Sequence, residues 1–216
     1  MIDKPAVSVI VPVFNCEKTI LNTLNSIINQ NIENFEIIVI DNNSIDTTVD
    51  KIRTIKDKRL KLLFCKKVGP AAARNYGIKK ANADIIAFLD ADDLWDENKL
   101  KESLSMLKKF DFIYHDLLLF RMNFHSLVPK GILKSRELES PIKKDLLKNG
   151  NGIITSSVVL RKSLIEKAGF FDENINLFAA EDYDLWIRIS EITENFKRIQ
   201  KPLGKYLLTG NNITNS

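Results

Sequence analysis

The feature that most constrains the fold is a regular alternation of short apolar runs with amphipathic segments. Runs rich in β-forming residues at 6–11, 35–40, 60–64 and 85–89 are typical of strands buried on both faces. The segments between them place apolar residues three and four positions apart, as a helix does. Strands that alternate with helices favour a mostly parallel sheet flanked by helices. We therefore predict an α/β fold, with the first strand ending at Pro12.

Beyond residue 93 the pattern is less regular. We expect helices over 100–107, 164–168 and 183–192, strands around 112–114 and 153–160, an edge strand near 206–208, and a loop with a short helix over 130–148. No repeat, low-complexity tract or linker divides the 216 residues, a normal length for one domain. We therefore treat residues 1–216 as a single domain.

Composition excludes several classes of protein. Hydrophobic residues make up 44% and charged residues 28%, which is ordinary for a globular chain and excludes disorder as the main state. The net charge of +4 comes from scattered lysines, so strong nucleic-acid binding is not expected. Cys16 and Cys65 form no metal or disulfide pattern and suit a reducing cytoplasm. The N-terminus lacks the apolar core of a signal peptide, and no apolar run reaches the length of a membrane span.

Polar side chains follow the first, second and fourth predicted strands where each strand ends. They are Asn15, the Asp-Asn-Asn-Ser run at 41–44 and the Asp-Ala-Asp-Asp run at 90–93. In open α/β sheets the ligand crevice lies outside the carboxyl ends of the strands, so these groups are expected to converge on one ligand. Asn15 and Ser44 are also placed to cap the helices that follow them.

The cluster Asp90-Ala91-Asp92-Asp93 places three carboxylates within four residues. Like charges held this close are costly unless a cation joins them. Hard oxygen donors favour Mg²⁺ or Mn²⁺, with waters and ligand phosphates completing the coordination shell. The alternative is that one of these residues merely caps the following helix, although a cap needs only one carboxylate.

Two further segments carry candidate binding groups. Asp41 can accept hydrogen bonds from a nucleobase or ribose, although Asp, Asn and Ser are also ordinary turn residues. The segment 69–75 begins with small residues that allow close approach of a ligand, and its Arg74 can meet phosphate oxygens or pair with Asp90. The alternative for Arg74 is an ordinary packed surface residue.

A second acidic cluster, Glu181-Asp182-Tyr183-Asp184, stands at a predicted helix start. Acidic residues there complement the helix dipole, which is an alternative to a catalytic role. A helix N-terminus also lowers the pKa of a carboxylate and weakens it as a base. Burial or the neighbouring Glu181 must raise the pKa of Asp182 if it is to accept a proton.

Taken together, the ordered motifs resemble glycosyltransferase family 2. They are Val7 to Asn15, Asp41-Asn42-Asn43-Ser44, Ala73-Arg74-Asn75, Leu89 to Asp93, and Glu181-Asp182 followed by Leu185 and Arg188. The resemblance covers about residues 5–210 and implies the GT-A fold, a Rossmann-like nucleotide-diphospho-sugar transferase fold, with usually inverting chemistry. It also implies a nucleotide-binding half at about 5–95 and an acceptor and catalytic-base half at about 96–210.

The resemblance implies roles for particular residues. A nucleotide-sugar would be bound by Pro12, Val13, Phe14, Asn15, Asp41, Asn43, Arg74, Asp90 and Ala91, with Asp41 on the base, usually uracil. Asp92 would approach a bound Mn²⁺ or Mg²⁺, with Asp93 supporting it. Asp182 matches the catalytic base of the family, and Glu181 flanks it.

The chain departs from the family pattern in two places. Asn42-Asn43 stands where relatives often have Asp-Gly, and Asn tolerates the left-handed backbone that Gly supplies there. The sequence ends soon after Tyr206, so acceptor-binding parts are expected to be missing or to come from a second subunit in a homodimer. The Gln-x-x-Arg-Trp signature of processive synthases is absent, which favours transfer of a single sugar.

We therefore expect a cytoplasmic, metal-dependent inverting enzyme, peripheral to the inner face of the plasma membrane. It would transfer one sugar from a nucleotide-sugar, expected to be a UDP-sugar, to a glycan or lipid-linked acceptor in surface polysaccharide synthesis. The alternatives are a catalytically silent module that binds nucleotide-sugar or glycan, and a sugar-phosphate nucleotidyltransferase, which needs a glycine-rich loop that residues 11–15 lack. A dehalogenase-like phosphatase fits less well, because its Asp-x-Asp follows the first strand.

Overall fold

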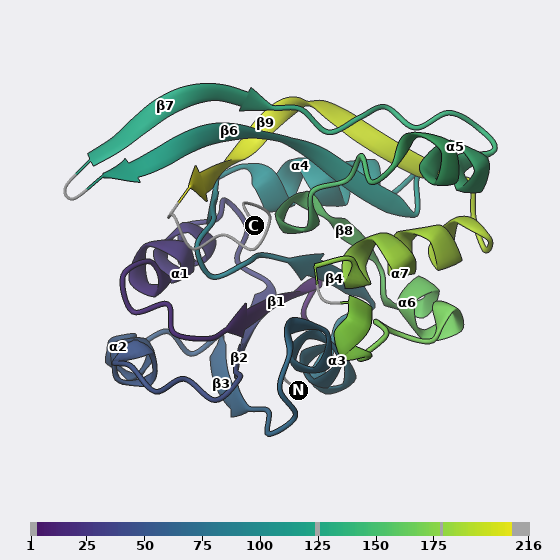
Figure 1. Ribbon diagram of the computed structural model, residues 1–216. Helices are drawn as coiled ribbons and strands as arrows, with labels where there is room; N and C mark the ends of the chain where they lie inside the picture. The colour runs from purple at the N-terminus through teal and green to yellow at the C-terminus, as the bar shows by residue number, and fades with distance from the viewer. Residues whose placement is uncertain (1–3, 124–125, 178, 209–216) are drawn as a thin grey trace.

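The computed structural model describes residues 4–123, 126–177 and 179–208. Within these residues nine strands form one twisted sheet, with helices on both faces (Figure 1). The strands are β1 (Val7–Val13), β2 (Phe35–Asp41), β3 (Leu60–Phe64), β4 (Ile85–Phe88), β5 (Leu94–Trp95), β6 (Phe112–Asn123), β7 (Ser126–Leu133), β8 (Val159–Arg161) and β9 (Phe196–Leu208). The helices are α1 (Ile20–Ile28), α2 (Thr48–Thr54), α3 (Pro70–Lys80), α4 (Lys99–Met106), α5 (Ile142–Asn149), α6 (Lys162–Ala168) and α7 (Glu181–Ser190), with 3-10 turns η1 (Thr155–Ser157) and η2 (Ile175–Leu177).

The sheet runs in the order β3-β2-β1-β4-β8-β6-β9-β5, and β7 pairs with β6. Strands β1 to β4 are mutually parallel, as the alternating pattern predicts. The α/β fold expected from the sequence is thus confirmed. Strand β1 does not end at Pro12 but continues to Val13. Pro12 lies beyond the last pair of β1 with β4, which joins Ile10 to Phe88, so its missing N–H interrupts no ladder bond there.

The second half of the sheet differs from the sequence expectation. Residues 126–133 form the hairpin strand β7, and the loop and helix expected over 130–148 are reduced to α5 and its connections. The strand expected over 153–160 is reduced to the short strand β8, which follows turn η1. The tail is not an edge strand, because β9 lies between β6 and β5 in the sheet.

The described core residues fall into two clusters, one on each face of the sheet. On the face covered by α3, α6 and α7, the Trp186 ring packs edge-on against Phe112 at 5.0 Å between centroids. Trp186 also packs against Phe88 of β4 at 6.3 Å. These aromatic contacts fix α7 on the sheet next to β4, so its first turn is held in place by the core.

The helices of the described residues are short beside the thickness of a lipid bilayer. Among them, none combines the length and the apolar character that crossing a membrane requires.

Candidate active site

The loops that follow β1 and β2 are bonded to each other at the carboxyl edge of the sheet. The Asn15 N–H donates to Ser44 Oγ at 3.1 Å, and the Ile45 N–H donates to Asn15 Oδ1 at 2.9 Å. These bonds contradict the capping roles expected for Asn15 and Ser44. Helix α1 begins only at Ile20 after Thr19, and α2 begins at Thr48 after Thr47, where Asp46 Oδ1 accepts the Thr48 N–H at 2.9 Å. Beside this loop pair, the Phe14 ring is 61% exposed.

Asp41 ends β2 with its carboxylate buried. Its Oδ2 accepts the Ser44 N–H at 3.3 Å, while its Oδ1 has no hydrogen-bond partner among the described residues. A buried carboxylate oxygen without a donor is costly unless a ligand supplies one. Asp41 is therefore built to receive an N–H or O–H from a bound molecule.

Asn42 and Asn43 occupy the places where the sequence departs from the Asp-Gly pattern. Asn43 has a φ of 69°, the left-handed conformation that Asn was expected to supply. Asn42 is buried: its Oδ1 accepts the Gly69 N–H at 2.7 Å, and its Nδ2 donates to the Lys67 carbonyl at 2.7 Å. Asn42 thus fixes the loop that leads into α3. The Asn43 amide donates to the Cys65 carbonyl at 3.3 Å, so both side chains hold this loop.

The acidic turn at 90–93 follows β4 directly. Burial, together with the Asp90 charge, raises the pKa of Asp92 to about 6. Asp93 is almost fully buried, and its Oδ1 accepts the Leu207 N–H of β9 at 3.2 Å. Burial and the two neighbouring carboxylates also hold the pKa of Asp93 well above its usual range. Asp93 therefore ties the turn to β9 from the core side, and its supporting role at a metal stays a prediction.

Arg74 joins the acidic turn to the second acidic cluster. It lies on α3 with its guanidinium buried, donating from Nη2 to Asp90 Oδ1 at 2.7 Å and from Nη1 to Glu181 Oε1 at 2.8 Å. The alternative of an ordinary surface arginine is therefore wrong. Because one rigid guanidinium spans both carboxylates, it holds Asp90, 16 positions along the chain from Arg74, close to Glu181, 107 positions along it.

Asp182 stands in the first turn of α7, beside Glu181. Its Oδ2 accepts a hydrogen bond from the Thr155 hydroxyl at 2.5 Å, and its Oδ1 accepts the Tyr183 N–H at 2.6 Å. Burial raises the pKa of Asp182 above its usual value. The hydrogen bond from Thr155 and the charge of Arg74 lower this pKa, but burial has the larger effect. Burial and the charge of Glu181 thus act in the direction that a general base at this position requires.

The carboxylates of the acidic turn fit a divalent cation that is coordinated partly by the protein and partly by a bound phosphate. Asp90 and Asp92 supply oxygen atoms, which Mg²⁺ and Mn²⁺ prefer. Within 4–123, 126–177 and 179–208, no group of three His, Cys, Asp or Glu side chains encloses a metal site by itself. A cation here would need oxygens from a bound ligand to complete its coordination.

Sequence reasoning missed two hydroxyl residues of turn η1. Thr155 bonds to Asp182, and Ser156 Oγ accepts the Asp90 N–H at 3.1 Å. Their signal was present, because Thr155-Ser156-Ser157 interrupts an otherwise apolar run at 153–160. Trp95 beside them is a buried core residue whose indole N–H donates to the Ser156 carbonyl at 2.8 Å.

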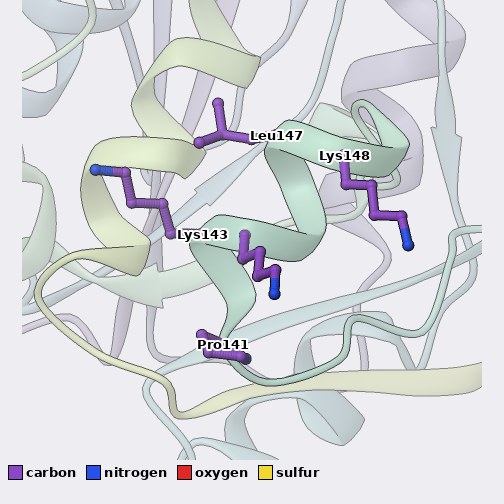
Figure 2. Close-up of a pocket in the computed structure, with 5 residues that line it drawn as sticks. Pro141, Lys143, Leu147 and Lys148 are labelled. Atoms are coloured by element: carbon purple, nitrogen blue, oxygen red, sulfur yellow. The ribbon is translucent and has the colours of Figure 1, made fainter.

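The described residues form one cleft beside this cluster and a separate hollow on α5. A small cleft opens between the N-terminus of α3 and residues 172–174, and Glu181 lines it. A shallow apolar depression lies on the outer face of α5, and Figure 2 shows Lys143, Leu147 and Lys148 projecting around it. Leu147 is 60% exposed. The loop after α5 approaches the cluster, since the Asn151 amide lies 3.5 Å from Asp182 Oδ2.

Comparison with known proteins identifies relatives of the chain. It is 34% identical over 215 residues to an uncharacterized glycosyltransferase of Rickettsia bellii, covering 96% of this chain but 29% of that protein. It is also 36% identical over 192 residues to the Escherichia coli UDP-Glc:alpha-D-GlcNAc-diphosphoundecaprenol beta-1,3-glucosyltransferase WfgD, covering 87% of this chain and 70% of WfgD. The chain thus spans about a third of the length of the Rickettsia relatives that it matches.

Solved structures share the fold. S. aureus TarS in complex with UDP-GlcNAc superposes with a TM-score of 0.79 at 22% identity, over 97% of this chain and 60% of the TarS chain. The Pyrobaculum calidifontis mannosyltransferase PcManGT, in complex with GDP-Man and Mn²⁺, gives a TM-score of 0.65 at 21% identity, over 93% and 55% of the two chains. Residues 8–169 match the family described as Glycosyl transferase family 2. With that match and the WfgD similarity across most of its length, the chain belongs to glycosyltransferase family 2 and has the GT-A fold.

Proposed function

We propose that this chain transfers one sugar, with inversion, from a UDP-sugar to a hydroxyl of a lipid-linked glycan in surface polysaccharide synthesis. The observation that carries the proposal is the Arg74 bridge, because it joins the turn that would hold the donor to Glu181, the chain neighbour of Asp182. The name of WfgD, which specifies UDP-Glc and a diphosphoundecaprenol-linked sugar, supports the donor and acceptor classes. In this proposal residues 5–95 bind the nucleotide and residues 96–210 serve the acceptor.

The donor nucleotide would lie along the loops after β1 and β2. Asp41 Oδ1, which lacks a partner among the described residues, is suited to accept an N–H of uracil. The exposed Phe14 ring offers a surface on which the base can stack. Pro12, Val13, Asn15 and Asn43 would complete this wall. The complex of TarS with UDP-GlcNAc supports a uridine nucleotide.

The diphosphate would lie between Arg74 and the acidic turn at 90–93. We propose that Asp92, with Asp90 beside it and Asp93 behind it, holds Mn²⁺ or Mg²⁺, and the Mn²⁺ complex of PcManGT supports this. When bound, that cation supplies positive charge against the departing diphosphate. The Arg74 guanidinium adds a fixed positive charge on the protein side.

Asp182 would act as the general base. The acceptor hydroxyl gives its proton to a carboxylate oxygen of Asp182 while its own oxygen bonds to the anomeric carbon. The bond from that carbon to the diphosphate oxygen breaks in the same displacement, so the configuration inverts and UDP leaves with the electron pair. Glu181 would hold Arg74 in place and line the small cleft beside the donor.

The test measures sugar transfer by the Asp182→Asn variant. UDP release is recorded in the presence of Mn²⁺, UDP-sugars and a lipid-linked GlcNAc acceptor. We expect a loss of about 10²–10⁴-fold in kcat, the usual contribution of a general base, with little change in UDP affinity. Asp184→Asn is the matched control, since this carboxylate lies in the same helical turn but pairs with Arg188. Full activity in Asp182→Asn would refute the assignment, and absence of transfer from any nucleotide-sugar by the wild-type chain would favour the silent binding module.

The metal assignment is tested separately by calorimetric titration with UDP. Asp92→Ala should remove the Mn²⁺-dependent part of UDP binding. Unchanged titration curves in this variant would remove Asp92 from the metal site.

We also propose that the outer face of α5 rests on an anionic membrane surface, which would bring the site to a lipid-linked acceptor. Lys144 and Lys148 have no ion-pair partner among the described residues, and Leu147 projects between the lysines. Basic side chains around an exposed leucine suit an anionic lipid interface. Flotation with vesicles that contain phosphatidylglycerol should capture the wild-type chain but not Lys144→Glu/Lys148→Glu. Equal capture of both would refute this surface.

The homodimer expected from the sequence stays a prediction. The proposed reaction does not depend on it, because every group named in that reaction comes from one chain. Light scattering in solution measures it directly.

A further inference from the structure

Turn η1 contacts the acidic turn and the proposed base at the same time. Ser156 Oγ accepts the Asp90 N–H at 3.1 Å, and the Ser156 carbonyl accepts the Trp95 indole N–H at 2.8 Å. On the other side, the Thr155 hydroxyl donates to Asp182 Oδ2 at 2.5 Å. Two consecutive residues thus connect β4 and its acidic turn to the first turn of α7.

The turn that presents the Thr155 hydroxyl is itself firmly held. Thr155 and Ser156 are both buried. The turn is closed by the Ser157 N–H, which donates to the Ile154 carbonyl at 2.9 Å. It continues into β8, which pairs antiparallel with β4. A donor on such a turn keeps its position without the entropy cost of ordering a free loop.

We propose that Thr155 is a positioning residue for the transfer reaction. Its hydroxyl holds the Asp182 carboxylate in a fixed position relative to the acidic turn that would bind the donor. This inference rests on the proposed role of Asp182 as the base. In it, Thr155 touches neither donor nor acceptor and acts only through Asp182. The hydroxyl occupies one lone pair of Oδ2, so the carboxylate cannot rotate freely about its bond to Cβ.

The same contact influences how readily Asp182 takes up a proton. The other groups that face this carboxylate are Arg74 of α3, Glu181 and the Tyr183 N–H of α7, and the Asn151 amide of the preceding loop. Burial raises the pKa of Asp182, while donation from Thr155 lowers it. Without the hydroxyl, the carboxylate should therefore protonate at a higher pH, and the acid limb of the kcat profile should move the same way.

The experiment compares Thr155→Val, which keeps the shape and removes the donor, with Thr155→Ser, which keeps the donor. The control is Ser157→Ala in the same turn, because among the described residues the Ser157 hydroxyl bonds only to the Ile154 carbonyl, at 2.6 Å. For each variant, kcat, the donor KM and the pH dependence of kcat from 5 to 9 are measured by UDP release with Mn²⁺. If thermal unfolding shows that Thr155→Val is not folded, Thr155→Ala, a smaller replacement that also removes the donor, is used instead.

We expect Thr155→Val to lower kcat by about 10–100-fold, the range for losing a hydrogen bond to a charged group, with donor KM within about twofold of wild type. Its acid limb should lie at higher pH, and Thr155→Ser should restore both properties. Thr155→Val/Asp182→Asn should be no slower than Asp182→Asn alone, because the hydroxyl acts only through that carboxylate.

Three results would overturn the inference. One is an unchanged kcat and pH profile in Thr155→Val, and another is an equal loss in Thr155→Ser. The third is a loss in Ser157→Ala as large as that in Thr155→Val, since it would assign the effect to the turn as a whole. If Asp182→Asn remains active, the proposed function fails and this inference with it. If Asp182→Asn is inactive while Thr155→Val keeps the wild-type profile, only this inference fails.

Discussion

Replacing Arg74 by methionine should destabilise the protein strongly. Its guanidinium side chain is 7% exposed and pairs with Glu181, which is 8% exposed, and with Asp90, which is 34% exposed. Removing one partner of a buried ion pair costs about 3–5 kcal/mol because a buried charge is left uncompensated. Since Asp90 keeps access to water, we expect the lower end, about 3 kcal/mol. For a chain of this size that corresponds to a fall in Tm of about 6–12 °C.

The assay is thermal unfolding followed by circular dichroism, at constant pH and without nucleotide. Arg53→Met is the matched control, since Arg53 pairs with Asp50 at 3.7 Å and both side chains are mostly exposed. Such a pair is worth about 0.5 kcal/mol, so Tm should move by no more than about 2 °C. Arg74→Met/Glu181→Gln should recover more than half of the loss, because it removes the stranded charge. A fall in Arg74→Met no larger than in Arg53→Met would refute the reasoning.

Two further predictions concern stability. Lys99 is fully buried with no hydrogen-bond partner for Nζ among the described residues, and burial holds its pKa well below the usual value. The unfolded chain therefore keeps the proton of this amine to a higher pH than the folded chain does, so wild-type stability should rise as pH increases from the lowered pKa of the folded state toward about 10. Lys99→Met should have a higher Tm than the wild-type chain at pH 7, and this difference in Tm should be smaller at pH 9. An equal difference at both pH values would contradict this account. Gly204→Ala should cost about 2–3 kcal/mol of overpacking and lower Tm by about 4–12 °C, because its Cβ would lie 2.5 Å from the Leu94 carbonyl oxygen and 2.9 Å from Leu117. Thermal unfolding measures the change, and an unchanged Tm would show that β5 and β9 can separate without cost.

Sequence patterns were sufficient where the information is local. The buried runs of β1, β2 and β4 come from hydrophobic residues adjacent in the chain, so their strands and the polar groups at their ends could be predicted. The left-handed conformation of Asn43 is also a local property, set by the residue type. These features include the acidic turn and most of the proposed donor site.

Patterns failed where a side chain has a distant partner. Asn15 and Ser44 are ordinary capping residues by type, but they bond to each other's loops across 29 positions of sequence. The Thr155–Asp182 bond joins residues 27 positions apart, and the Asp93 bond to β9 spans 114. Which polar groups meet across such separations depends on strand order, and the placement of β9 between β6 and β5 could not be read from periodicity.

The anchoring of Asp93 by the Leu207 N–H has a consequence for biosynthesis. The ribosome releases the acidic turn more than a hundred residues before the strand that secures it. A nascent chain can therefore pair β1, β2 and β3 early. The turn that would bind the donor is fixed only after almost all of the described residues have been synthesised. Competence to handle a reactive sugar donor would then arise only once translation of this region is nearly finished.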